Sequence, residues 1–150
     1  MMVERKPGRD GLAIAQVVIA IAGMLVAIYL TIIDYTGVEP YCAGYGGCNT
    51  VQSSEYAFIG PVPVALLGVL GYLALLALRL ARGRVGPELE DYLPLLAFGG
   101  SLIGLLYSAY LTYLEAFVIL AWCLWCIASA LLMTAYFVLA VLDWRRSTLE

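Results

Sequence analysis

The stretch LAIAQVVIAIAGMLVAIYLTII, residues 12–33, decides the kind of fold that this chain can adopt. It holds no charged residue and is longer than the roughly 20 helical residues that cross the hydrocarbon core of a bilayer. Three further apolar stretches follow, at residues 62–81, 93–114 and 117–142. None alternates apolar and polar residues as a barrel strand does, so helices are expected to satisfy the backbone in lipid. The sequence predicts an all-α membrane protein, a four-transmembrane-helix bundle that forms one domain over residues 1–150.

The overall composition agrees with this fold. Hydrophobic residues make up 63% of the chain and charged residues only 13%, with a mean hydropathy of +0.93. A soluble domain cannot hide so many apolar side chains in its interior. The basic segment MMVERKPGRD precedes an apolar stretch longer than a signal-peptide core, without a clear small-residue cleavage site. The first helix is therefore expected to be retained.

The cationic residues predict the orientation in the membrane. The segment from Asp34 to Pro61 and the turn around Glu115 contain no Lys or Arg. By the positive-inside rule, both termini are expected in the cytoplasm and the long loop between the first two helices faces outward. The net charge of −3, without a larger basic cluster, argues against nucleic acid as a partner. The eight cations fall in three places that four spans bring to one side: Arg5, Lys6 and Arg9; Arg79, Arg82 and Arg84; Arg145 and Arg146.

The outward loop is the longest connection in the chain and carries EPYCAGYGGCNTVQSSEYAFIGP, residues 39–61. Loops of this length in compact proteins are usually functional or disordered. Asn49 could cap a short interfacial helix that runs to Phe58. Pro61 and Pro63 suit the first turn of the second helix, where a missing N–H is not needed.

The third helix carries two residue patterns. Tyrosines recur toward its outward end, as interfacial aromatic residues do, although a tyrosine wall could also line a pocket. Small residues at four-residue spacing predict close packing against another helix. The tyrosines are Tyr107, Tyr110 and Tyr113, and the small residues are Gly100, Gly104 and Ser108.

All four cysteines are predicted on the outward side: Cys42 and Cys48 in the loop, and Cys123 and Cys126 near the start of the fourth helix. Outward compartments are usually oxidising, so two disulfides or a rearranging set of thiols is expected. Cys123 and Cys126 share a helix face at a spacing of three. No cation lies on this side, so the helix N-terminus is the group that can favour a thiolate.

Two other roles are open to the cysteines. A zinc site is disfavoured because five residues separate the loop cysteines, Cys126 lies at lipid depth, and the chain has no histidine. No metal is expected. Two static disulfides in a non-enzymatic membrane protein remain the alternative, although a bridge within one helical turn closes a tiny loop and stabilises little.

The segment CNTVQSSEYAFIGPVPVALLG, residues 48–68, together with the loop cysteine pair and the C-x-x-C of the fourth helix, resembles the vitamin K epoxide reductase (VKOR) family. The resemblance covers all four predicted helices. It implies a prokaryotic homologue in the cell membrane that acts as a thiol:quinone oxidoreductase and generates disulfides.

The resemblance also implies a role for each site residue. Cys42 and Cys48 would accept electrons from a thioredoxin-like partner of the DsbA type, and Cys48 would pass them to Cys123 through a transient mixed disulfide. Cys126 would face a quinone of the ubiquinone or menaquinone type. Ser54 matches a polar position near the quinone. Glycines between the loop cysteines fit a loop that docks in two positions.

The chain departs from the family pattern in places. Some members carry a tyrosine one turn after the second cysteine of the C-x-x-C, but this chain has Ala130 there, and its one asparagine is Asn49. Epoxide reduction and anticoagulant binding are therefore not expected. Because Glu150 follows soon after the fourth helix, no fused thioredoxin-like domain is expected and the partner would be a separate protein.

Trp122 and Trp125 flank the C-x-x-C. Both are expected to anchor the helix at the membrane interface, since tryptophan gathers there. A wall of the quinone site is the alternative for each of them.

Overall fold

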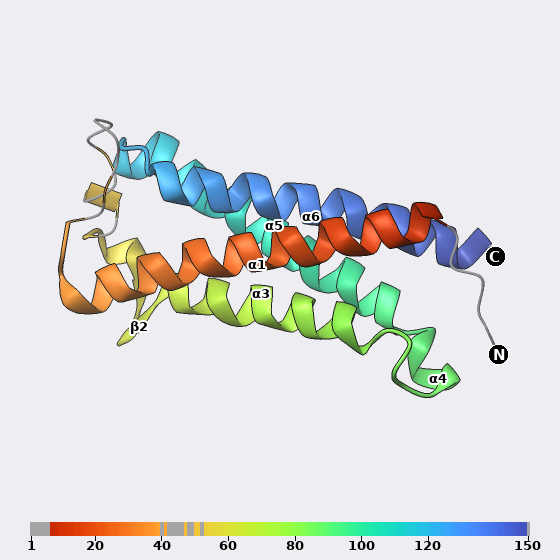
Figure 1. Ribbon diagram of the computed structural model, residues 1–150. Helices are drawn as coiled ribbons and strands as arrows, with labels where there is room; N and C mark the ends of the chain where they lie inside the picture. Colours follow the sequence, from red (N-terminus) through yellow and green to blue (C-terminus); the bar gives the residue numbers. More distant parts are fainter. Residues whose placement is uncertain (1–6, 40, 42–46, 48–49, 52, 150) are drawn as a thin grey trace.

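The computed structural model describes residues 7–39, 41, 47, 50–51 and 53–149. Four long helices form one bundle, and each is long and apolar enough to cross a membrane (Figure 1). The predicted all-α membrane bundle is confirmed. The helices are α1 (Pro7–Thr36), α3 (Val64–Ala81), α5 (Leu93–Tyr113) and α6 (Leu124–Leu149).

The helices pack so that α1 contacts α3 and α6, while α5 contacts the same two helices. Many large apolar side chains face outward, among them Ile14 and Ile103, as expected of a surface that meets lipid rather than water. The interior is a cluster of small and aromatic side chains where the helices approach closely: Ala20, Ala27, Tyr72, Leu75, Met133, Tyr136 and Ala140.

Glycines allow two of these close approaches. The ring of Tyr72 lies directly against Gly23 of α1, where any side chain would overlap it. A Cβ at Gly104 would lie 2.8 Å from the Met133 side chain, and one at Gly100 would lie 3.4 Å from Leu75. The predicted packing role of Gly104 is confirmed, whereas a Cβ at Gly100 would make an ordinary van der Waals contact.

The turn from α5 into α6 differs from the prediction. Residues Leu114–Ile119 continue α5 as a wider π-helical turn, and Leu120 then takes a left-handed conformation with φ 58°. The Ala121 N–H donates to the Glu115 carbonyl at 3.1 Å and closes the helix end. The prediction that the fourth helix begins at residue 117 was therefore wrong, because residues 117–119 belong to the preceding helix and α6 begins at Leu124.

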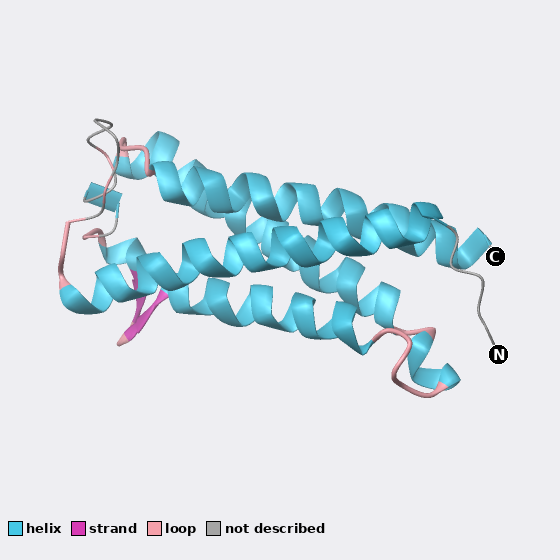
Figure 2. Ribbon diagram, in the orientation of Figure 1, coloured by secondary structure: helices cyan, strands magenta, loops and turns pink. Residues whose placement is uncertain are grey.

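A short hairpin lies between the loop and α3. The 3-10 helix Glu55–Ala57 leads into β1 (Phe58–Ile59), which pairs antiparallel with β2 (Val62–Pro63) through a turn at Gly60 (Figure 2). The helix predicted from Asn49 to Phe58 was wrong at its end, since Phe58 is in a strand, and Asn49 lies outside the described residues. Pro63 precedes α3 in extended conformation rather than lying within its first turn.

The two ends of the bundle differ in charge. The start of α1, the end of α6 and the connection that holds α4 (Pro87–Glu90) lie at one end, and the end of α1 and the start of α6 lie at the other (Figure 1). At the charged end Asp143 of α6 forms an ion pair with Arg82 and lies 3.8 Å from Arg79, so it links α6 to the end of α3. The C-x-x-C lies at the opposite end, where α6 begins.

Candidate functional site

The C-x-x-C lies at the start of α6. Cys123 immediately precedes the helix and is fully buried, and Cys126 lies in its first turn. The backbone N–H of Cys126 donates to Cys123 Sγ at 3.3 Å, and the N–H of Ile127 donates to the Cys123 carbonyl at 3.0 Å. Cys123 therefore occupies the capping position, where the helix N-terminus stabilises a thiolate.

Glu115 is the charged residue nearest to this pair of cysteines. Its side chain is only 3% exposed, and its Oε2 accepts the backbone N–H of Cys123 at 3.2 Å. The Cys126 thiol also forms a hydrogen bond with this carboxyl. The sequence did not identify Glu115 as a site residue. The available signal was one acidic residue within two joined apolar stretches that hold no cation.

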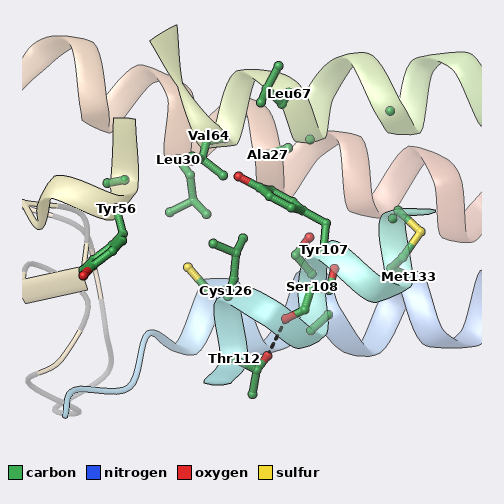
Figure 3. Close-up of a pocket in the computed structure, with 18 of the residues that line it drawn as sticks. Ala27, Leu30, Tyr56, Val64, Leu67, Tyr107, Ser108, Thr112, Cys126 and Met133 are labelled. Atoms are coloured by element: carbon green, nitrogen blue, oxygen red, sulfur yellow. Dashed lines mark hydrogen bonds between the residues drawn. The ribbon is translucent and has the colours of Figure 1, made fainter. Parts of the chain in front are cut away.

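A cavity of about 370 Å³ opens beside Cys126, among the four helices and the hairpin segment. Its wall is mostly apolar, and the side chains of Cys126 and Tyr107 point into it (Figure 3). Cys123 does not line it. A cavity of this size and polarity is typical of a site for a small apolar ligand. The apolar wall includes Ala27, Leu30, Val64, Leu67 and Met133.

A few polar side chains also face this cavity. Ser54 lines it, with its hydroxyl donating to the Val51 carbonyl at 2.7 Å. Thr112 and Ser108 line it from α5, where the Thr112 hydroxyl donates to the Ser108 carbonyl at 2.8 Å. The structure thus brings the predicted residues Ser54 and Cys126 to one cavity. It contains no cluster of three metal-ligating side chains among the described residues.

Tyr72 brings a phenol to the cavity near Ala130, the position at which some family members carry a tyrosine. Tyr72 of α3 donates to the Ser129 carbonyl at 2.8 Å, and its hydroxyl lies 3.1 Å from the Ser129 hydroxyl. All three residues line the cavity. The chain thus has no tyrosine at position 130, but Tyr72 from another helix lines the same cavity.

Trp125 holds the loop against the start of α6. Its indole N–H donates to the Tyr41 carbonyl at 2.6 Å, and the Tyr41 N–H donates to the Tyr29 hydroxyl at 3.0 Å. The rings of Tyr29 and Trp125 are 4.9 Å apart. Trp125 therefore fixes the residue that precedes Cys42 in the chain. Trp122 is half-exposed, and neither tryptophan lines the cavity.

A second loop contact lies beside Cys123. Gly47 lies directly against the backbone of Trp122, with no room for a side chain. The Val51 N–H donates to the Gly47 carbonyl at 3.1 Å, and Val51 packs against Cys123. Gly47 precedes Cys48 in the sequence as Trp122 precedes Cys123. Cys42 and Cys48 themselves lie outside the described residues, so the pairing predicted for them stays a prediction.

The fold and the site together define a class: a four-helix membrane protein whose buried C-x-x-C opens onto an apolar cavity. The chain belongs to the vitamin K epoxide reductase family, whose family model matches residues 14–141. It is 32% identical over 125 residues to the thiol-disulfide oxidoreductase LTO1 of Arabidopsis thaliana, an alignment that covers 80% of this chain and 33% of that protein. The chain thus spans about a third of the length of this relative. The predicted family membership is confirmed.

Proposed function

We propose that this protein is a membrane thiol:quinone oxidoreductase that generates disulfides. Electrons would enter from a thioredoxin-like partner of the DsbA type at Cys42 and Cys48, pass to Cys123 and Cys126, and leave to a quinone. One observation carries the proposal: the Cys126 side chain points into an apolar cavity inside the bundle, while Cys123 is buried beside it and faces the loop residue Val51.

The cavity suits a quinone. An apolar ring fits a wall of alkyl side chains, and polar contacts at a few points would orient its oxygens. Ser54, Tyr107 and Thr112 are the residues of the wall that we expect to hold it. When bound, a quinone supplies an acceptor for two electrons and two protons, which the chain itself lacks.

The transfer between the two cysteine pairs is a thiol–disulfide exchange. Such exchange needs a thiolate that reaches the partner sulfur in line. The helix N-terminus favours the thiolate of Cys123, and the contact of Gly47 with Trp122 brings the chain next to Cys48 against the chain next to Cys123. These contacts support a mixed disulfide between Cys48 and Cys123 as the intermediate. The name of the relative, a thiol-disulfide oxidoreductase, supports the same chemistry.

The first prediction tests the electron acceptor. In purified protein, Cys126→Ala should reduce quinone-dependent oxidation of a dithiol partner to the rate without enzyme, because no thiol among the described residues then lines the cavity. The matched control is Leu131→Ala on the same helix, whose side chain is 66% exposed and points away from the site. It should keep the rate of the unchanged protein. Quinol formation, followed by absorbance, is the measurement.

The same variant tests the order of transfer. Without Cys126 to resolve it, the Cys48–Cys123 bond should accumulate and be found by mass spectrometry of the non-reduced protein. A protein with two static disulfides needs no such bond. Unchanged quinone turnover in Cys126→Ala, or absence of the Cys48–Cys123 bond in every redox state, would contradict the proposed function and favour the structural alternative.

A further inference from the structure

Glu115 places a carboxyl between the backbone of one cysteine and the thiol of the other. Its Oε2 accepts the Cys123 N–H at 3.2 Å, and its carboxyl is hydrogen-bonded to the Cys126 thiol. Glu115 also lines the cavity into which Cys126 points. One side chain therefore touches a reacting sulfur and the space where the electron acceptor would lie.

The surroundings of Glu115 do little to stabilise a negative charge on its carboxyl. The side chain is 3% exposed, and the sequence holds no Lys, Arg or His between Arg84 and Arg145 or between Arg9 and Arg79. The hydrogen-bond partners of the carboxyl among the described residues are Cys123 and Cys126. A buried carboxylate without a cation is costly in free energy. Burial therefore favours the protonated form of such a carboxyl, which makes it suited to accept a proton during a reaction cycle.

We propose that Glu115 is the proton-transfer residue of the C-x-x-C: its carboxylate takes the proton from the Cys126 thiol and passes it to the acceptor in the cavity. This inference rests on the proposed thiol:quinone function and names the group that moves a proton within it. From the sequence, Glu115 was expected only to lie in a turn.

The proton balance of the reaction requires such a group. Two thiols and one quinone give one disulfide and one quinol, so two electrons and two protons move together. The electrons pass from the sulfurs to the quinone as the Cys123–Cys126 bond forms. Glu115 takes the proton of the Cys126 thiol and passes it to the quinone. The proton of Cys123 leaves to water at the outer end of the bundle, and the quinol takes an equivalent proton from water.

The Glu115→Gln substitution tests the proton-transfer role of this side chain separately from its positioning role. In Glu115→Gln the side-chain oxygen can still accept the Cys123 N–H, so the turn keeps its hydrogen bond, but an amide cannot take a proton. Glu115→Asp keeps the acid on a shorter stem. The matched control is Glu55→Gln, which removes an exposed carboxylate near the same end of the bundle. Thermal unfolding of each variant shows whether the bundle is intact.

The first measurement needs no quinone. The full chain, reduced and then oxidised by a small disulfide, is compared by infrared difference spectroscopy. We expect a carboxylic-acid band to appear on oxidation, because Glu115 takes the Cys126 proton as the disulfide forms. The band should be missing in Glu115→Gln, shifted in Glu115→Asp and unchanged in Glu55→Gln. A carboxylate in both redox states would overturn the proposal.

The second measurement is a single turnover of the reduced protein with a soluble short-tail quinone. Glu115→Gln should slow quinol formation on the order of 100-fold, the usual size of a general acid–base contribution, and lose the solvent deuterium isotope effect of the unchanged protein. Wild-type rates in Glu115→Gln would also overturn the proposal. If the unchanged protein reduces no quinone, the proposed function fails, and the infrared band still decides the role of Glu115.

Discussion

At the scale of single residues, Gly47 has one of the tightest contacts in the site. It lies against the Trp122 backbone without space for a Cβ, beside the position where electrons would cross from the loop to the C-x-x-C. Even a methyl group must push the loop away. Exchange chemistry is sensitive to such shifts, since a displacement of about 1 Å can cost about 100-fold in rate.

Gly47→Ala should therefore slow formation of the Cys48–Cys123 bond by about 10- to 100-fold. Stopping the reaction with acid and separating the products by mass gives the rate. Gly99→Ala in α5 is the control, because nothing lies within 4 Å of a Cβ built there. An unchanged rate in Gly47→Ala would mean that the transfer occurs with the loop in another position.

The sequence indicated the cysteines of the candidate site but not the residues that surround them. A C-x-x-C and a loop pair can be read from spacing, and Ser54 from the segment around it. Glu115 and Gly47 could not be found in this way, because their importance comes from the left-handed Leu120 and from a contact between residues far apart in sequence. Neither feature has a local pattern.

At the scale of the helices, the ion pair of Asp143 links α6 to the end of α3. The carboxylate contacts Arg82 and Arg79, and all three side chains are less than one-fifth exposed. Removing one partner of a buried pair leaves the other charge without compensation. The link lies at the end of the bundle opposite the C-x-x-C, so stability and chemistry can be tested separately.

Asp143→Asn should lower the free energy of unfolding by up to about 3 kcal/mol and lower the unfolding temperature in detergent. The rate of quinol formation per folded protein should stay the same. Asp91→Asn, which changes an exposed carboxylate beside α4, is the matched control and should unfold as the unchanged protein does. Equal stability of the two variants would show that the Asp143 pair contributes nothing.

Helix existence was predictable and helix ends were not. The apolar stretches indicated all four spans, yet α1 extends beyond residues 12–33 at both ends because polar residues continue the helix. The turn before α6 lies inside an uninterrupted apolar run, where no glycine, proline or asparagine marks the break. The consequence is chemical, since the true start at Leu124 places Cys123 at the helix N-terminus rather than inside the helix.

At the scale of the whole molecule, the arrangement predicts an orientation. The described cations gather at the end of the bundle where α1 starts and α6 ends, and the C-x-x-C lies at the other end. The positive-inside rule then predicts that Cys123 and Cys126 lie toward the side of the membrane away from the cytoplasm. This orientation agrees with the proposed function, because disulfides persist in oxidising compartments.

After mild reduction, Cys42 should react with a membrane-impermeant thiol reagent added to the outer side of intact cells. The control is Thr148→Cys in a chain without the other cysteines, which places one exposed thiol at the charged end. It should react only after the cells are opened. Gel shift of the labelled protein reports both. Labelling of Cys42 from the cytoplasmic side alone would reverse the orientation.

Most of the residues that line the cavity could not be predicted from the sequence. Its wall combines α1, α3, α5, α6 and the hairpin segment, so it exists only once the bundle is assembled. The family resemblance implied an apolar acceptor, which would need a pocket of this kind. The volume, the Tyr72 phenol beside Ala130 and the polar edge of Ser108 and Thr112 come from the three-dimensional packing.

The complete burial of Cys123 has a last consequence. In a compartment with many small soluble thiols, an open cysteine pair would be reduced by any of them, and the acceptor would be consumed without useful product. Because the Cys123 sulfur has no exposed surface, small thiols in solution cannot reach it directly. Under the proposed function, electrons would reach Cys123 through the loop cysteines rather than directly from small thiols.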